Sequence, residues 1–301
     1  MAVEVLNEQD CALPDSQEWQ PILAEQAAAT VIVTRWREDQ STTVADALAQ
    51  EVPVALIYNG ISHVVMLATP ADLEDFAYGF SFTEGIITER GQIYGVEARA
   101  LTQADGQLQG IELHIDLATE QFVALKAQRR NLTGRTGCGL CGAESLQQVF
   151  KQPMPASSPL VSLSLTALEA ALNGLKTRQP LQQLTGATHA SAIADAHGQV
   201  VCVREDVGRH NALDKLIGSL LRQGHDFSVF WATHWVLTTS RASYEMVQKV
   251  AVCGGRALVA LSAPTALAVS LAKEYDFLLV GFARATQCVV YSGELRDHRK
   301  R

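Results

Sequence analysis

Two cysteines, Cys138 and Cys141, form a C-x-x-C pair within the glycine-rich stretch TGRTGCGLCGAESL. Such a pair can bind a metal ion, exchange electrons as a disulfide, or present a thiolate that carries sulfur. Basic residues, including Arg130 and Arg135, precede the pair, and a helix predicted to begin near Ala143 points the positive end of its dipole back at the loop. Both features favour the thiolate. The flanking glycines suit a cysteine that must meet a donor and an acceptor in turn.

The residue spacing supports zinc less well than sulfur chemistry. A structural zinc site needs four ligands, usually from two such pairs, and this chain has one C-x-x-C pair. His189 in THASA invites comparison with zinc deaminases, but Ser191 stands where the catalytic Glu belongs and Gly137 where the signature has Pro. A redox dithiol normally follows a buried strand, whereas this pair follows the polar RRNLTGRTG. The spacing favours a nucleophilic or persulfide-bearing cysteine, with a redox dithiol and a zinc-dependent hydrolase as alternatives.

Polar and cationic residues follow the predicted strands in the second half of the chain. Arg241 comes after VLTT, Ser262 after LVAL, Arg284 after LLVG, and the run REDVGRHN after VCV. Ligands of open α/β sheets bind beyond the carboxyl ends of the strands, and hydroxyl groups, guanidinium groups and helix N-termini bind phosphate. We therefore expect a nucleotide-like ligand at this edge. The alternative is that these residues are ordinary helix caps and solvated charges.

The composition is typical of a globular protein of about two domains. The chain has 301 residues, 48% of them hydrophobic, and a formal net charge of −8. The negative charge argues against a nucleic-acid partner, and no apolar run approaches the length that would span a membrane. The first residues lack a basic and an apolar signal region, so we expect a cytoplasmic protein.

The first half of the chain predicts a mobile tail (1–24) and an α+β domain (25–130). Asn59-Gly60 separates two β-rich runs as the turn of a hairpin. Thr69 is expected to cap the next helix, which has one apolar face, and alternating apolar residues predict a strand over 111–117.

The second half predicts a C-x-x-C loop with a connector (131–160) and an α/β domain (161–301). Its strands are apolar throughout and alternate with helices, the first of which Asn211 is expected to cap. This alternation is typical of a largely parallel sheet with helices on both faces.

Several motifs together resemble the formate dehydrogenase accessory sulfurtransferase family, FdhD. They run from about residue 52 to 284 and are VPVALIYNGISHVVMLATPADLEDFAYGFSFTEGII, GCGLCG, THASAI, REDVGRHNALDKLIG, SRASYEMVQK, SAPTALAV and GFAR. The resemblance implies a cytoplasmic homodimer whose C-terminal domain has a cytidine-deaminase-like fold. It also implies that sulfur passes as a persulfide from a cysteine desulfurase to the bis(molybdopterin guanine dinucleotide) cofactor of molybdenum or tungsten, before that cofactor enters the formate dehydrogenase catalytic subunit.

The same resemblance assigns roles to individual residues. Cys138 is expected to bear the persulfide, and Cys141 to act as its partner in relay or exchange. The family's cofactor-binding segment corresponds to Phe282, Ala283, Arg284, Ala285, Thr286 and Gln287. With the strand-end argument, this predicts that Arg241, Ser262 and Arg284 contact the nucleotide portion of the cofactor, which a guanine nucleotide can mimic. The alternative to a sulfurtransferase is a non-catalytic chaperone that binds the cofactor or the apoenzyme, with structural cysteines.

Overall fold

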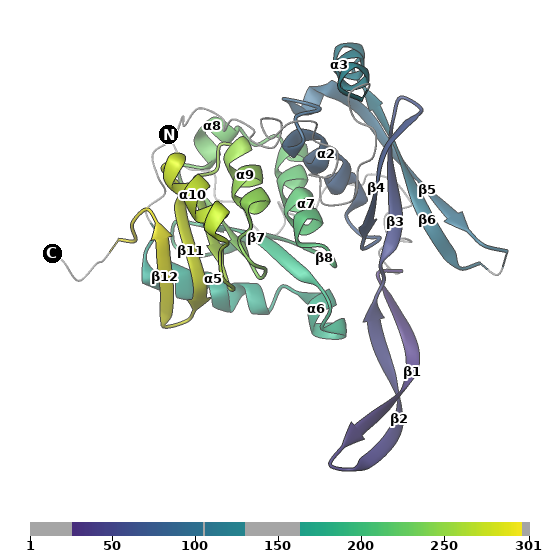
Figure 1. Cartoon of the computed structure of the whole chain (residues 1–301), viewed down its shortest axis with the longest axis horizontal. Coiled ribbons are helices and arrows are strands. Elements are labelled where there is room, and N and C mark those ends of the chain that lie inside the picture. The colour runs from purple at the N-terminus through teal and green to yellow at the C-terminus, as the bar shows by residue number, and fades with distance from the viewer. Residues whose placement is uncertain (1–25, 105, 130–162, 297–301) are drawn as a thin grey trace.

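The computed structural model describes residues 26–104, 106–129 and 163–296 (Figure 1). The predicted tail and the predicted C-x-x-C loop, with Cys138 and Cys141, lie outside the described residues. The elements are β1 (Ala28–Arg37), β2 (Gln40–Ala49), β3 (Val52–Tyr58), β4 (Ile61–Ala68), α2 (Leu73–Thr83), η2 (Arg90–Gln92), β5 (Ile93–Thr102), β6 (Leu108–Leu117), α3 (Thr119–Arg129), α5 (Leu165–Lys176), α6 (Pro180–Thr185), β7 (His189–Asp195), β8 (Val200–Asp206), α7 (Arg209–Arg222), α8 (Phe227–Phe230), β9 (His234–Thr238), α9 (Tyr244–Val252), β10 (Ala257–Ala260), α10 (Ala266–Glu274), β11 (Leu278–Arg284) and β12 (Gln287–Ser292). This mixture of helices and sheets confirms the α/β class, while the cytidine-deaminase-like detail stays a prediction. Within the described ranges, no helix is long and apolar enough to cross a membrane.

The hairpin predicted at Asn59-Gly60 is present as β3 and β4. Asn59 and Gly60 have φ angles of 45° and 79°, as the tight turn requires. The Asn59 side chain also holds the end of β6, because it accepts a hydrogen bond from the Leu117 N–H at 2.6 Å and donates one to the Leu117 carbonyl at 2.8 Å. The hairpin belongs to a four-stranded sheet of order β4-β3-β6-β5, in which β6 confirms the predicted strand.

The predicted cap of α2 is wrong. The helix begins at Leu73 after Asp72, which has a left-handed φ of 51° and makes no side-chain cap. Thr69 instead bonds to the end of β8: its N–H donates to Asp206 Oδ2 at 3.0 Å, and its hydroxyl accepts from the Val207 N–H at 3.2 Å. A residue type that favours helix caps is used here for a contact between distant parts of the chain.

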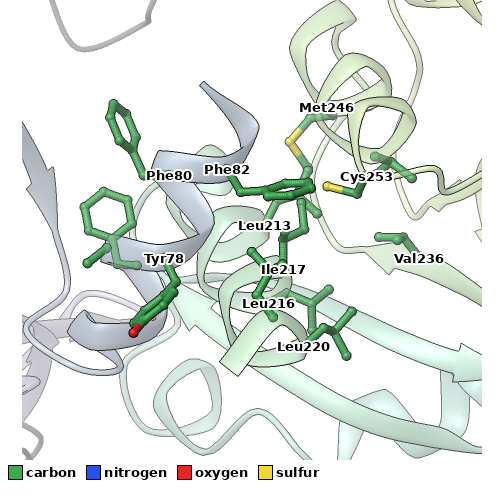
Figure 2. Close-up of a cluster of buried hydrophobic side chains, with 14 of the residues drawn as sticks. Tyr78, Phe80, Phe82, Leu213, Leu216, Ile217, Leu220, Val236, Met246 and Cys253 are labelled. Atoms are coloured by element: carbon green, nitrogen blue, oxygen red, sulfur yellow. The ribbon is translucent and has the colours of Figure 1, made fainter. Parts of the chain in front are cut away.

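Helix α2 is buried on two sides, whereas the sequence predicted a helix with only one apolar, buried face. Nearly all of its residues are buried. Figure 2 shows Phe82 pointing toward Met246 and Cys253, while Phe80 points away from α7. On the α7 side the two backbones approach closely at Gly79 and Gly218. One hydrophobic cluster therefore runs from the four-stranded sheet through α2 and α7 to α9. The predicted domain boundary near residue 130 stays a prediction.

The second sheet is mixed: the four predicted strands, β8 to β11, share one direction as expected, but β7 and β12 were not predicted and run opposite to them. Its order is β12-β11-β10-β9-β7-β8. Only β9, β10 and β11 are paired in parallel, because β7 runs antiparallel to both of its neighbours and β12 antiparallel to β11. Helices α7, α9 and α10 cover one face and α5 the other (Figure 1). Helices on both faces were expected, and that expectation is confirmed.

Strands β1 and β2 form a separate two-stranded ribbon that projects away from the other two sheets (Figure 1). Ile32 and Trp36 on the ribbon are 72% and 69% exposed. Such a ribbon has little core of its own, so its stability depends on its ten-residue ladder and on its base near α6.

Candidate functional site

The polar loops predicted to converge do lie at one edge of the six-stranded sheet. Because β7 runs antiparallel to both β8 and β9, these two strands share a direction with β10 and β11. The segments after β8, β9, β10 and β11 therefore leave the sheet at the same edge. The argument from strand ends holds although the sheet is mixed, since only the direction of these four strands matters.

The run REDVGRHN was expected to follow its strand as a loop, but β8 extends to Asp206 and the first three residues of the run form structural contacts. Arg204 Nε lies 2.8 Å from Asp75 Oδ2 of α2. Glu205 accepts hydrogen bonds from two backbone N–H groups at the start of α6, and Asp206 forms a fully buried ion pair with Lys215 at 2.6 Å. These charges are neither placed to bind a ligand nor solvated, because they are paired within the protein.

The last two residues of the run, His210 and Asn211, belong to α7. Asn211 does not cap α7, which begins after Gly208; it lies in the first turn and its side chain donates to the Leu67 carbonyl at 2.8 Å. His210 Nε2 lies 2.8 Å from Glu245 Oε2. Burial raises the pKa of Glu245, but the hydrogen bond and charge of His210 outweigh it and leave that pKa lowered.

A cavity of about 440 Å³ lies between α5 and the ends of β9, β10 and β11. Its lining residues are Leu172, Leu175, Lys176, Gln179, Thr239, Leu261, Ser262, Ala283, Arg284 and Ala285. The volume is in the range of small-molecule sites, and the lining combines leucine side chains with a few hydroxyl, amide and cationic groups. We call it the strand-end pocket.

A left-handed residue shapes the β11 side of the strand-end pocket. Phe282 has a φ of 50°, its N–H donates to the Ser262 carbonyl at 3.1 Å, and its side chain is 45% exposed. The pairing of β11 with β12 shifts register between Gly281 and Arg284. This irregularity changes which side chains of the strand face each side of the sheet. As a result, Ala283 is fully buried against the α5 layer, and Arg284 follows it at the pocket.

The Arg284 guanidinium group is anchored at the pocket by backbone carbonyls. Its Nη1 donates to the Leu261 oxygen at 2.6 Å and to the Ala283 oxygen at 2.7 Å. These two bonds leave the remaining guanidinium N–H groups for other acceptors, such as phosphate oxygens. The charge is thus fixed beside the Ser262 segment, although the side chain is exposed.

The structure brings only some of the predicted site residues to the strand-end pocket. Four of them, Ser262, Ala283, Arg284 and Ala285, line it. The others do not: Arg241 is exposed in the loop after β9, Phe282 is turned out by its backbone, and Thr286 and Gln287 are exposed at the β11–β12 turn.

The α5 wall of the pocket was missed by the sequence analysis. It consists of Leu172, Leu175 and Lys176 of α5 together with Gln179, which precedes α6. A signal was available, because Ser164 caps the helix through the Ala167 N–H at 3.1 Å and buried residues then recur at helical spacing.

His189, weighed as a zinc ligand, begins β7 opposite Asp206. Burial lowers its pKa, and the nearby charge of Arg209 lowers it further. Over residues 26–104, 106–129 and 163–296, no group of three or more His, Cys, Asp or Glu side chains is placed to hold a metal ion.

Comparisons with known proteins give a consistent result. Residues 49–297 match the model of the FdhD/NarQ family. A protein of Cupriavidus necator named sulfur carrier protein FdhD is 53% identical over 264 residues, 88% of each chain, and one of Bordetella petrii with the same name is 46% identical over 272 residues, 90% of this chain and 94% of the relative. The crystal structure of a putative formate dehydrogenase accessory protein from Desulfotalea psychrophila shares the fold, with a TM-score of 0.67 at 22% identity over 89% of this chain and 98% of that one.

Proposed function

Because this chain belongs to the FdhD/NarQ family, we propose that it is a sulfur carrier that serves formate dehydrogenase. The observation that carries the proposal is the extent of the likeness: about half of the residues are identical to a named sulfur carrier over 88% of both chains. The matched range includes the C-x-x-C pair, and a carrier of sulfane sulfur needs such reactive thiols.

The first step loads Cys138. Its thiolate attacks the terminal sulfur of a persulfide on a cysteine desulfurase, forming a new S–S bond to Cys138 and releasing the desulfurase cysteine as a thiolate. A proton moves with the transferred sulfur, so the products are a Cys138 persulfide and the free donor cysteine. No net oxidation occurs in this exchange.

The second step delivers the sulfur to the bis(molybdopterin guanine dinucleotide) cofactor of molybdenum or tungsten, which is the substrate. The Cys141 thiolate attacks Cys138 Sγ, which closes a Cys138–Cys141 disulfide and releases the outer sulfur as hydrosulfide to the metal. The two cysteines supply the two electrons that reduce sulfane sulfur to sulfide. A cellular dithiol reductant then restores both thiols.

The strand-end pocket is where the nucleotide portion of the cofactor binds. Ser262 and the anchored Arg284 offer a hydroxyl group and charged N–H donors on one side of the pocket. The exposed Arg241 and the segment from the end of β11 to the start of β12, Phe282 to Gln287, lie at the same edge of the sheet, and this position supports contacts with the outer parts of so large a cofactor.

The protein acts in the cytoplasm as a homodimer and hands the sulfurated cofactor to the formate dehydrogenase catalytic subunit. The family resemblance supports these assignments, and the name of the Cupriavidus necator relative supports the role in sulfur transfer. No nucleic acid or membrane is needed.

Mass spectrometry tests the carrier role. The full-length protein is incubated with a cysteine desulfurase and cysteine, and the tryptic peptide from Thr136 to Lys151 is analysed for added sulfur. We expect one reductant-sensitive sulfur, absent from Cys138→Ala and retained by Cys141→Ala. The chaperone alternative instead expects no adduct, and it expects the double cysteine variant to restore formate dehydrogenase activity to cells that lack the protein.

A further inference from the structure

A histidine and a glutamate meet at the edge of the six-stranded sheet where the cofactor is proposed to bind. His210 lies in the first turn of α7, which follows β8, and Glu245 in the first turn of α9, which follows β9. His210 Nε2 lies 2.8 Å from Glu245 Oε2, and each side chain is 18% exposed. The pair is thus largely enclosed by protein and keeps some contact with solvent.

This contact differs from the structural ion pairs nearby. Asp206 and Lys215 are fully buried together, and the carboxyl groups of Asp75 and Asp214 are 2% exposed. Each of these acids is shared between two or more donors. His210 makes its contacts through Nε2 alone, and its Nδ1 has no hydrogen-bond partner in the part of the chain that the structure describes. One ring nitrogen therefore remains for a ligand.

The contact with Glu245 decides what the remaining nitrogen can do. The carboxylate accepts the Nε2–H, so Nδ1 of the neutral ring holds a lone pair and Nδ1 of the charged ring holds a second proton. The Ser243 hydroxyl lies 3.5 Å from the same Nε2. A serine nucleophile needs its base at the ring nitrogen opposite the carboxylate, so the three residues are not a hydrolytic triad. They present a histidine whose Nδ1 can release and take up a proton.

The neighbouring charges keep Glu245 ionised. Burial acts to raise its pKa, but His210, Arg209 and Lys249 outweigh burial and leave that pKa lowered. The carboxylate therefore remains an acceptor for the His210 Nε2–H at neutral pH. The other charged groups at this edge are His189 of β7, Asp206 of β8 and the exposed Arg241 before α9.

Delivery of sulfur to the metal requires a proton to move. In the proposed function the outer sulfur reaches the metal as hydrosulfide. When hydrosulfide replaces a hydroxide ligand of the metal, the metal–oxygen bond breaks, a metal–sulfur bond forms, and the hydrosulfide proton leaves with the oxygen as water. The total charge and the oxidation state of the metal do not change. A group that gives one proton and takes the other accelerates such an exchange.

We propose that His210 is the proton-transfer residue of sulfur delivery. The charged ring donates its Nδ1 proton to the departing hydroxide, and the neutral ring then accepts the proton of the bound hydrosulfide at the same nitrogen. Glu245 is a positioning residue that holds the ring through Nε2–H and stabilises its positive charge. The inference rests on the proposed function and deepens it, because it concerns the acceptor side of the transfer rather than the cysteines.

Complementation of cells that lack the protein gives two readouts, formate dehydrogenase activity and, by mass spectrometry, the fraction of protein that carries persulfide at Cys138. His210→Gln should lower the activity about tenfold or more and raise the persulfide fraction, because loading continues while delivery slows. His114→Gln is the matched control, since His114 Nε2 lies 3.0 Å from Glu112 Oε2 on the four-stranded sheet. Activity close to wild type, a persulfide fraction that falls with the activity, or an equal effect of His114→Gln would overturn the proposal.

Glu245 variants separate positioning from proton transfer in the same cells. Glu245→Gln should lower the activity less than His210→Gln, because Nδ1 is still present, and Glu245→Asp should recover part of the loss by returning the carboxylate. His210→Asn serves as a second variant if His210→Gln does not fold. Wild-type activity in Glu245→Gln would contradict the positioning role.

Release of sulfide from the loaded protein by dithiothreitol, without the cofactor, shows where His210 acts. Wild type and His210→Gln should release sulfide at the same rate, because the proposed proton transfer takes place at the metal. Slower release by the variant would place the histidine at the cysteines and overturn the proposal.

The wild-type results distinguish this inference from the proposed function. If the wild-type protein takes up no sulfur from a desulfurase, the carrier role fails and the inference fails with it. If the wild-type protein loads and supports formate dehydrogenase, and the His210 variants do so equally well, the carrier role stands and only the inference fails.

Discussion

Gly79 of α2 and Gly218 of α7 lie backbone to backbone where the two helices cross. A Cβ atom added to Gly79 would stand 1.7 Å from the Asp214 carbonyl oxygen and 2.8 Å from the Gly218 nitrogen. A Cβ atom added to Gly218 would stand 1.8 Å from the Asp75 carbonyl oxygen. The distance between the helices is thus set by two residues that lack a side chain, and the neighbours that a methyl group would meet are backbone atoms.

Alanine at either crossing position should strongly destabilise the protein. Because the backbone of a packed helix must move to admit the methyl group, we expect Gly79→Ala and Gly218→Ala each to lower the free energy of unfolding by about 3 kcal/mol or more. Gly91→Ala is the control, since nothing lies within 4 Å of the Cβ built there. Urea denaturation of the three variants measures the difference; similar midpoints for all three would contradict the packing described here.

Substitutions of the buried ion pair Asp206 and Lys215 should have non-additive effects on the free energy of unfolding. Both side chains are fully buried, and Lys215 Nζ also donates to the Thr69 carbonyl at 3.0 Å. Lys215→Met leaves a buried carboxylate without its cation, so we expect a loss of about 3–5 kcal/mol in the free energy of unfolding. The double variant Asp206→Asn with Lys215→Met should lose less than the single lysine variant. Additive losses in a double-mutant cycle would show that the pair is not coupled.

Acid should destabilise the protein through His234. Its ring stacks on Phe230 with centroids 4.1 Å apart, and burial lowers its pKa, although the bond to the Phe230 carbonyl acts in the opposite direction. The unfolded histidine takes up a proton as the pH falls through about 6.5, while the folded one stays neutral to lower pH. The stability that this group contributes is therefore complete above that pH and is lost as the pH falls through the folded pKa.

The pH dependence of unfolding measures this effect. Between pH 7.5 and 5.5, His234→Phe should lose less unfolding free energy than the wild type, whatever its absolute stability. The unfolding free energy of this variant will still depend on pH to some extent, because the pKa of His189 is also lowered. His197→Gln is the control, an exposed histidine in the β7–β8 turn, and should keep the wild-type slope.

At position 282, glycine should give a more stable protein than alanine, which is the reverse of the usual order of stability. At a φ of 50°, any residue with a Cβ is strained by about 1–2 kcal/mol, and glycine is not. We expect Phe282→Gly to have a free energy of unfolding about 1 kcal/mol above that of Phe282→Ala, because both lose the same ring and only alanine keeps the strain. Thermal melts of the two variants compare them directly; an alanine variant as stable as the glycine variant would argue against a left-handed residue here.

Local chemistry explains which parts of the fold could be predicted. The Asn59-Gly60 turn and the strand that became β6 depend on residues adjacent in sequence, and both predictions are correct. The predicted helix cap at Thr69 was wrong because its polar groups bond to Asp206 and Val207, more than a hundred residues away. The residues next to Thr69 in the sequence give no indication of such a contact. The direction of β7 likewise depends on how the preceding segment reaches the sheet, which an apolar run does not encode.

The same distinction applies to the candidate site. Ser262 and Arg284 were predictable because the carboxyl ends of strands that share a direction meet at one edge. Lys176 and Gln179 were not, since a helix that covers the sheet is placed by tertiary packing rather than by strand order. Arg204 and Glu205 show the opposite error: in the sequence their charges seemed available to a ligand, but in the structure they bond to α2 and to the start of α6.

The two-sided burial of α2 bears on how the protein can be divided. A cut in the chain after residue 129 would give a first fragment whose α2 exposes Phe82 and Gly79, and a second fragment whose α7 exposes the surface that they cover. Neither fragment would be soluble alone, whereas the two produced together in one cell can complement each other by rebuilding the crossing. Fusion, permutation or exchange between relatives must therefore treat the halves joined by α2 and α7 as a single indivisible body.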